Sequence, residues 1–460
     1  MNYHRFLSEK LSAHKPSGFE ISLGSLNSNL FDWQKILVRW ALFKGKAALF
    51  EDCGLGKTLQ QLEWALQVHK YTGQDVLIFA PLAVSQQTVR EGAKFGITVN
   101  RCLDSKDVKP GINITNYERI DLFDHARFVG IVLDESSIIK DFTGAFCNNL
   151  IEKYSDTPYK LACSATPSPN DYTELGNTAE FLGVMTRSEM LSMFFINDSG
   201  DTTASWRLKG HVKDNKFWEW LASWCVAIQK PSDIGFDDNG FILPELVMHE
   251  HIIPAEANGW FVEQASGLSE IRDSMRETLE DRAEVCAAIV NASDDIWAVW
   301  CGLNDESKRL TALINGAVEV CGSDSADHKE KSFLDFADSK IKALVTKPKI
   351  AMWGLNWQNC NHVVVTGLSH SYEQFYQLVR RFYRFGQTKP VHVHIVIGER
   401  EGIVLDAIRR KEKQAAEMFA GMIRHMRNIT ITELQHTQRK ATGYSPTVEM
   451  VLPSFLEEAA

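Results

Sequence analysis

Residues 50–58 read FEDCGLGKT, and the fold of the first half of the chain depends on this stretch. It ends in Gly56, Lys57 and Thr58, as phosphate-binding loops do. The general pattern, however, has a glycine where this chain has Glu51. Average glycine usage would produce such a string by chance in roughly one or two chains in a hundred of this length. The flanking sequence therefore decides between a nucleotide site and an ordinary turn.

The residues on both sides of the loop favour a nucleotide site. Residues 46–50 (KAALF) form a short apolar run, typical of a buried parallel strand. Downstream, Leu59, Leu62 and Leu66 recur at helical spacing, so we expect a helix to begin at the loop. A strand, a glycine-rich turn and a helix together direct backbone N–H groups and a helix N-terminus at phosphates.

Length and composition indicate a globular protein of several domains. The chain has 460 residues, of which 44% are hydrophobic and 23% charged. Its nine scattered cysteines form no Cys-x-x-Cys pair, which favours reduced thiols over a disulfide framework or a zinc ribbon. Because no apolar stretch is long enough for a signal peptide or a membrane span, we expect a cytoplasmic protein without a membrane partner. The net charge of −10 does not exclude nucleic acid, since phosphate contact needs only a local basic surface.

Short apolar runs alternate with helical patterns, which predicts an α/β fold with two mainly parallel sheets in tandem. We expect a first lobe over residues 31–245, with an aromatic accessory region over about 183–245, and a second lobe over 246–427. Residues 1–30 and 428–460 are expected to be accessory segments. The expected strands are 47–50, 76–80, 112–115, 129–133 and 161–164 in the first lobe, and 297–301, 341–346, 362–366 and 391–397 in the second.

An acidic pair follows one of these strands. FVGIVLDESS at 128–137 leads an apolar strand directly into Asp134 and Glu135. Open α/β sheets bind their ligands at the carboxyl ends of strands. In phosphoryl transfer, one such carboxylate helps to hold Mg²⁺, and a second positions and deprotonates the attacking water. An ordinary strand-to-loop turn is the alternative, but the pair lies in the same expected sheet as the phosphate loop.

Two further segments, LACSATPSPN at 161–170 and QLVRRFYRFGQ at 377–387, complete a set of motifs. With them, the chain resembles the superfamily-2 helicase-type ATPases, and within these the Swi/Snf-type DNA translocases, over about residues 31–415. The phosphate loop of that family typically begins with Asp-Glu, so Glu51 and Asp52 are a near-variant. The resemblance implies two RecA-like lobes with ATP and Mg²⁺ in the cleft between them.

The resemblance also implies roles for the residues around the phosphate loop. Gly54, Gly56 and Lys57 would hold the phosphates, with the lysine paired to the β- and γ-phosphates. Thr58 would supply a hydroxyl to Mg²⁺. Gln34, in FDWQKILVRWAL, would read the adenine edge.

The remaining motifs match at further positions. Asp134 corresponds to the Mg²⁺-associated acid of the family and Glu135 to its catalytic base. SATP at 164–167 resembles the motif that couples nucleotide state to movement of the nucleic-acid groove. Gly354, in GLN at 354–356, resembles the link between bound strand and ATP in the second lobe and is a nucleotide-binding candidate.

The last motif supplies the expected second half of the catalytic set. Arg381 and Arg384 align with two arginines that reach across the cleft to the γ-phosphate, and Gln377 opens the motif. Their spacing predicts one helical turn between them, so that both guanidiniums face one phosphate. In related phosphoryl-transfer systems such an arginine is worth roughly 10³–10⁵ in rate.

Other features do not support a separate site. His392 and His394 alternate along one strand, but without a third ligand nearby we expect a structural role, not a metal site. Residues 217–225, with three tryptophans, fit one helix that packs an aromatic face. Ser137 stands where the family commonly has a histidine or similar residue, and 370–372 replace its Trp-Asn-Pro. The chain also lacks room for large insertions, so we expect a compact bacterial or phage member.

The expected function is DNA-stimulated ATP hydrolysis that drives translocation along duplex DNA by a monomer. Single-stranded DNA and RNA are less favoured partners. The alternatives are a strand-separating DNA or RNA helicase, and an ATP-gated DNA-binding subunit that recruits a nuclease or methylase. The catalytic set disfavours the last alternative, because a protein that only binds has no need of Glu135, Arg381 and Arg384.

Overall fold

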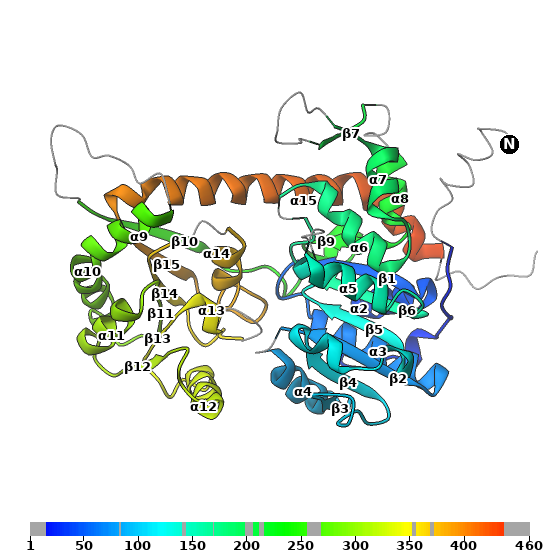
Figure 1. Cartoon of the computed structure of the whole chain (residues 1–460), viewed down its shortest axis with the longest axis horizontal. Helices are drawn as coiled ribbons and strands as arrows, with labels where there is room; N and C mark the ends of the chain where they lie inside the picture. Colours follow the sequence, from blue (N-terminus) through cyan, green and yellow to red (C-terminus); the bar gives the residue numbers. More distant parts are fainter. Residues whose placement is uncertain are drawn as a thin grey trace, which may run out of the picture.

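Two parallel β-sheets, one in each half of the sequence, form the framework of the molecule (Figure 1). This computed structural model describes residues 15–81, 84–139, 144–168, 170–197, 206–210, 216–254, 268–351, 356–368 and 372–436. Helices flank both sheets, so the predicted α/β fold with two tandem RecA-like lobes is confirmed.

The first sheet has seven parallel strands in the order β3-β4-β2-β5-β6-β1-β9. Its strands are β1 (Lys46–Glu51), β2 (Asp75–Ala80), β3 (Val99–Arg101), β4 (Ile112–Asn116), β5 (Phe128–Asp134), β6 (Tyr159–Ser164) and β9 (Cys225–Ile228). All seven residues of β5 are buried, because helices cover both faces of the sheet. The strands β3 and β9 were missed by the sequence analysis.

Helices pack on both faces of this first sheet. They are α2 (Asp32–Lys44), α3 (Lys57–Thr72), α4 (Val84–Lys94), α5 (Ala145–Lys153), α6 (Leu175–Leu182), α7 (Arg187–Phe194) and α8 (Lys216–Ala222). Trp40 of α2 and Trp64 of α3 are buried in the core on one face. Leu150 of α5, Phe181 of α6 and Trp224 are buried in the core on the other. A small antiparallel hairpin of β7 (Phe195–Asn197) and β8 (Trp206–Leu208) lies apart from both large sheets.

The prediction of one helix over residues 217–225 was wrong at its end. The helix α8 stops at Ala222, and Cys225 begins β9. The backbone N–H of Ala48 in β1 donates a hydrogen bond to the carbonyl oxygen of Trp224. Pairing with β1 therefore draws this segment into the sheet and overrides its helical pattern.

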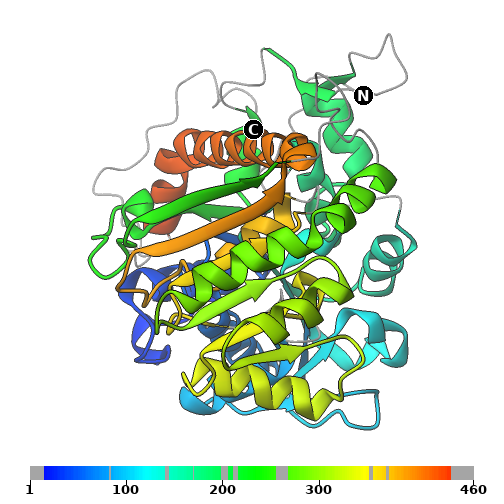
Figure 2. The same cartoon turned by 90° about the vertical axis from the view of Figure 1, so that its left-hand side faces the viewer.

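The second sheet has six parallel strands in the order β10-β15-β14-β11-β13-β12. They are β10 (Leu246–Ile253), β11 (Trp297–Trp300), β12 (Ala317–Val320), β13 (Ala343–Thr346), β14 (His362–Thr366) and β15 (Val391–Gly398). The helices of this half are α9 (Leu268–Glu277), α10 (Leu279–Asn291), α11 (Asn304–Leu313), α12 (Ala326–Ala337), α13 (Pro348–Ala351) and α14 (Tyr372–Val379). Figure 2 shows the edge strand β10 beside β15. The sequence analysis missed β10 and β12, whose residues are mostly only half-buried.

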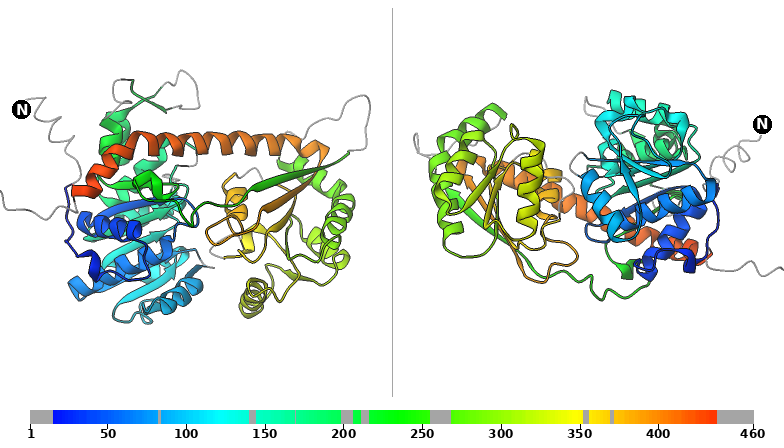
Figure 3. Two further views of the ribbon diagram at one scale, coloured as in Figure 1. Left: turned by 180° about the vertical axis from the view of Figure 1, so that it is seen from behind. Right: turned by 90° about the horizontal axis from the view of Figure 1, so that it is seen from below.

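One long helix, α15 (Gly402–His436), runs along both lobes (Figure 3). Val404 and Ile408 near its start belong to a core of the second lobe. Met422 and Met426 belong to a core of the first. The predicted boundary between residues 427 and 428 falls within this helix.

Two further features concern the cysteines and the hydrophobicity of the helices. All nine cysteines are free thiols, and only Cys53 and Cys321 among them are partly exposed. Among the helices in the described ranges, none combines the length and the apolar character needed to cross a bilayer.

Candidate active site

The phosphate loop connects the end of β1 to the start of α3. Gly54 has φ of +90° and Gly56 has φ of +78°, backbone conformations that side-chain-bearing residues rarely adopt. A Cβ atom on Gly56 would lie 2.5 Å from Nε2 of Gln34. One on Gly54 would lie 2.5 Å from the backbone nitrogen of Phe385 in the second lobe. Both positions therefore require glycine, for conformation and for space.

The ammonium group of Lys57 is held by the loop itself. Its Nζ donates hydrogen bonds to the carbonyl oxygens of Glu51, at 2.7 Å, and Asp52, at 3.1 Å. Burial alone would lower the pKa of Lys57, but neighbouring acidic groups, among them Glu135, raise it above its usual value. A positive charge is thus fixed at the mouth of the loop.

Gln34 is buried against the same loop. Its Nε2 donates to the carbonyl oxygen of Leu55 at 2.8 Å, and its Oε1 accepts from the backbone N–H of Phe31 at 2.9 Å. The predicted adenine-reading residue therefore also braces the phosphate loop.

The acidic pair lies where predicted, at the carboxyl end of β5. Asp134 Oδ1 accepts a hydrogen bond from Gln61 Nε2 at 2.8 Å, and its backbone carbonyl accepts one from the Tyr117 hydroxyl at 2.6 Å. Glu135 has φ of +59°, which is rare outside glycine and typical of functional sites. Burial raises the pKa of Glu135 to about 7, and its Oε2 is buried without a hydrogen-bond partner. A carboxylate with these properties can act as a general base near neutral pH.

The two arginines face the same cavity from the second lobe, but not from a helix. The helix α14 ends at Val379, and the backbone N–H of Trp357 donates to the carbonyl oxygen of Arg381 at 3.1 Å. The prediction of a regular helical turn between Arg381 and Arg384 was therefore wrong, because that carbonyl is bonded outside the segment. Burial, and then the charge of Arg384, lowers the pKa of Arg381 to about 10. Because its surroundings disfavour the charged form of Arg381, an anion bound nearby would be stabilising.

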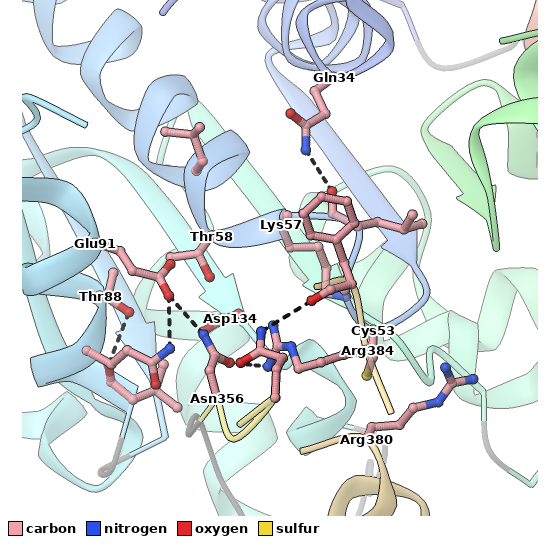
Figure 4. A pocket seen from close by; sticks show the side chains of 18 of the residues that line it. Gln34, Cys53, Lys57, Thr58, Thr88, Glu91, Asp134, Asn356, Arg380 and Arg384 are labelled. Carbon is pink, nitrogen blue, oxygen red and sulfur yellow. Dashed lines mark hydrogen bonds between the residues drawn. The ribbon is translucent and has the colours of Figure 1, made fainter. Parts of the chain in front are cut away.

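A cavity of about 400 Å³ joins these groups, and both lobes line it (Figure 4). Gly354 lies outside the described residues. The remaining predicted site residues all line the cavity, namely Gln34, Gly54, Gly56, Lys57, Thr58, Asp134, Glu135, Gln377, Arg381 and Arg384.

The cavity also contains polar residues that the sequence analysis missed. Glu91 of α4 accepts a hydrogen bond at Oε1 from Asn356 Nδ2 of the second lobe, at 3.1 Å. Asn356 in turn accepts one from Arg384. Cys53 and Arg380 line the cavity as well. The polar residues of α4 carry no local signal, since a solvated helix face has the same composition.

Three phenylalanines gather at one part of this cavity wall. Phe241, from the segment between the two sheets, has its ring centroid 4.8 Å from that of Phe385 and 5.2 Å from that of Phe31. Aromatic rings in such a group can stack on a flat base. The sequence offered no signal for this group, because its members are distant along the chain.

The donor set suits Mg²⁺ only together with phosphate oxygens. The described residues contain no group of three or more His, Cys, Asp and Glu that could hold a metal ion alone. Mg²⁺, however, is commonly held by one or two carboxylates plus substrate phosphates. The Asp134 carboxylate and the Thr58 hydroxyl, both lining the cavity, fit that pattern.

The histidines of β15 have neighbours that the sequence analysis did not foresee. His249 Nε2 lies 3.0 Å from His392 Nδ1, and His251 Nε2 lies 3.1 Å from His394 Nδ1. The ring of His362 stacks on that of His392. These histidine neighbours could not be read from the sequence, but the described residues include no group of three or more His, Cys, Asp and Glu that could hold a metal ion.

Comparisons with known proteins bear on the second lobe most directly. Residues 303–386 match the family model described as "Helicase conserved C-terminal domain". The chain is similar to the bifunctional helicase and thymine dioxygenase JBP2 of Leishmania tarentolae and of Leishmania infantum, with 34% identity over 119 residues. That alignment covers 25% of this chain and only 11% of each relative. A Sulfolobus solfataricus SWI2/SNF2 ATPase core, solved in complex with dsDNA, is similar over 94% of this chain and all of its own, with 18% identity and a TM-score of 0.40.

The family match therefore applies to one part of the second lobe, within a chain that has two parallel sheets flanked by helices. The matched segment includes Asn356, Gln377, Arg381 and Arg384. The second-lobe residues that line the cavity therefore lie within the segment that matches the helicase C-terminal domain.

Proposed function

We propose that this chain is a DNA-dependent ATPase that hydrolyses ATP to move along duplex DNA, in the manner of Swi/Snf-type translocases. One observation carries the proposal. A single cavity combines a phosphate loop and an acidic pair from the first lobe with two arginines from a helicase C-terminal domain.

Each group has a role in the proposed reaction. Lys57 binds the β- and γ-phosphates through the same Nζ that contacts the loop carbonyls. Glu135 positions the attacking water and accepts its proton, which its raised pKa favours. Arg381 and Arg384 stabilise the charge that develops on the transferring phosphoryl group. Because the arginines belong to the second lobe, hydrolysis depends on how closely the lobes approach.

The Asp134 carboxylate and the Thr58 hydroxyl would hold Mg²⁺ together with the phosphates. The ion would supply charge neutralisation at the β- and γ-phosphate oxygens.

Duplex DNA is the proposed track because of the Swi/Snf-type motifs, and because the similar Sulfolobus core was solved with dsDNA. Swi/Snf-type motors hold the backbone through largely sequence-independent contacts, so their affinity falls as salt rises. A strand-separating helicase is the second candidate, since the JBP2 relatives are named as helicases. An ATP-gated DNA-binding subunit that recruits a nuclease or methylase is a third, but it gives no role to Glu135.

The chemistry is tested by Glu135→Gln, which keeps the shape of the side chain and removes the base. This variant should bind ATP and lose nearly all turnover, whereas Lys57→Ala should weaken ATP binding itself. Glu118→Gln changes an exposed glutamate of the same lobe and should retain the parental rate. Hydrolysis by Glu135→Gln near the parental rate in saturating DNA would show that the base is another residue.

The mode of action is tested by two assays with the parent protein. ATPase activity should rise more with duplex DNA than with single-stranded DNA or RNA, and displacement of a third strand from a triplex should require ATP. Efficient opening of a forked duplex without triplex displacement would instead identify a strand-separating helicase.

A further inference from the structure

A polar contact crosses the cleft beside the catalytic groups. The Tyr376 hydroxyl donates to Asp52 Oδ1 at 2.6 Å, and Arg380 Nη2 donates to Asp52 Oδ2 at 3.0 Å. Asp52 belongs to the phosphate loop, and Tyr376 and Arg380 belong to the second lobe. Both oxygens of one carboxylate are thus bonded from the opposite lobe. We call these three residues the interlobe latch.

Arg380 and Asp52 of the latch also contact groups of their own lobe. The Arg380 guanidinium lies 5.0 Å from the ring centroid of Tyr376 and 5.4 Å from that of Tyr383. Planar guanidinium groups stack favourably on aromatic faces. On the other side of the cleft, Asp52 Oδ1 also accepts the backbone N–H of Cys53 at 2.7 Å, which fixes the carboxylate on its loop.

The latch is also shielded from water. The side chains of Arg380 and Asp52 are 18% and 14% exposed, respectively. Charged hydrogen bonds are stronger in such surroundings than at an open surface, where ion pairs contribute little. The contact is therefore able to influence the equilibrium between open and closed lobes.

The position of the latch connects it to the catalytic groups. Arg380 directly precedes Arg381, and Tyr376 directly precedes Gln377. Asp52 lies in the loop that ends at Lys57. The latch therefore ties the loop that would hold the phosphates to the segment that carries the arginines, through protein groups alone. Small misplacements of catalytic groups reduce rates strongly, so this tie matters for the reaction.

We propose that the interlobe latch closes the lobes before nucleotide binds and so positions Arg381 and Arg384 over the phosphate loop. The part that concerns the arginines rests on the proposed function, whereas closure by the latch does not. When only a fraction of molecules is competent to bind, apparent affinity falls by that fraction. The latch thus raises apparent ATP affinity by keeping the competent, closed state populated.

The direct test measures the distance between the lobes without nucleotide. Dyes attached through unnatural amino acids at the exposed positions Lys106 and Lys331 report this distance by single-molecule energy transfer. The parent should show mainly one closed population. Asp52→Asn and Arg380→Gln should each shift the equilibrium toward open molecules by about tenfold, the usual effect of losing one charged hydrogen bond. ADP with aluminium fluoride should restore the closed population.

Kinetics distinguish the latch from the catalytic arginines. Latch variants should act mainly on KM for ATP, which should rise about two- to fourfold as the closed fraction falls, and less on kcat, because saturating ATP closes the lobes again. Tyr376→Phe keeps the ring and should give the same pattern. The Asp52→Asn, Arg380→Gln double variant should be no more open than Asp52→Asn alone, since Arg380 acts on the latch through Asp52.

A matched control removes an ion pair that does not join the lobes. Arg309 pairs with Glu280 at 2.7 Å within the second lobe, so Arg309→Gln should leave the interlobe distance unchanged. The proposal is overturned if nucleotide-free Asp52→Asn and Tyr376→Phe are as closed as the parent, or if the parent itself is open. If the chain hydrolyses no ATP, the proposed function fails, but the nucleotide-free distances still decide whether the latch exists.

Discussion

Two glycines at opposite ends of α3 allow a sharp test of the phosphate loop. Gly56 caps the start of this helix with φ of +78°, and Gly73 caps its end with φ of +71°. A Cβ atom on Gly56 would lie 2.5 Å from Gln34 Nε2, whereas one on Gly73 would have no atom within 4 Å. The substitutions Gly56→Ala and Gly73→Ala therefore impose the same backbone strain but differ in what they displace.

The expected energies follow from this difference. A left-handed conformation costs about 1–2 kcal/mol for alanine, so both variants should lose about that much unfolding free energy. In Gly56→Ala the side chain of Gln34 must also move and lose its 2.8 Å hydrogen bond to the carbonyl oxygen of Leu55. That loss adds about 1 kcal/mol. The added strain falls within the loop that would hold the phosphates.

Urea unfolding and ATP binding, measured by calorimetry, separate the two effects. Both variants should be destabilised, Gly56→Ala by about 1 kcal/mol more than Gly73→Ala. ATP affinity should fall at least about tenfold in Gly56→Ala and stay within about twofold of the parent in Gly73→Ala. Equal ATP affinity in the two variants would refute the reasoning, since it would mean that the contact between the loop and Gln34 plays no part in binding.

Two further predictions concern a thiol and a histidine. ATP should protect Cys53, which lines the cavity, from alkylation by iodoacetamide, whereas Cys321, the other partly exposed cysteine, should react equally with and without ATP. If mass spectrometry showed that Cys53 is labelled equally with and without ATP, nucleotide binding in this cavity would be excluded. Burial and neighbouring histidines lower the pKa of His394 from 6.5 to about 4, so the unfolded chain takes up a proton first as pH falls. Unfolding free energy should therefore fall between about pH 6.5 and 4, and His394→Asn should reduce that fall; an unchanged pH profile in the variant would contradict this.

The phosphate loop and the acidic pair could be predicted because their signals are local. Each follows a continuous apolar run, which predicts a buried parallel strand, and the chemistry lies at the strand's end. The strand before Glu135 is confirmed within one residue at each end. The roles of Lys57 and Glu135 remain predictions, supported by their place in one cavity.

The sequence analysis failed to predict features that depend on contacts between residues far apart in the sequence. Residues 225–228 become a strand because they pair with β1, far away in sequence. The histidines meet because β10 and β15 pair in a register that sets His249 opposite His394. The contact of Glu91 with Asn356 depends on how the two lobes approach. No periodicity within a short window carries such information.

The continuity of α15 has a mechanical consequence. Its 35 residues extend for about 50 Å, with its two ends anchored in different lobes. Between the anchors Ile408 and Met422, residues 409–420 contain neither proline nor glycine, and Gly421 stands directly before the second anchor. Helix segments without such residues bend gently and resist sharp kinks. The helix therefore behaves as a stiff but bendable connection, which permits small movements of one lobe against the other and opposes large ones. Bending the helix costs energy that its return recovers, so the stiffness of α15 opposes wide separation of the lobes.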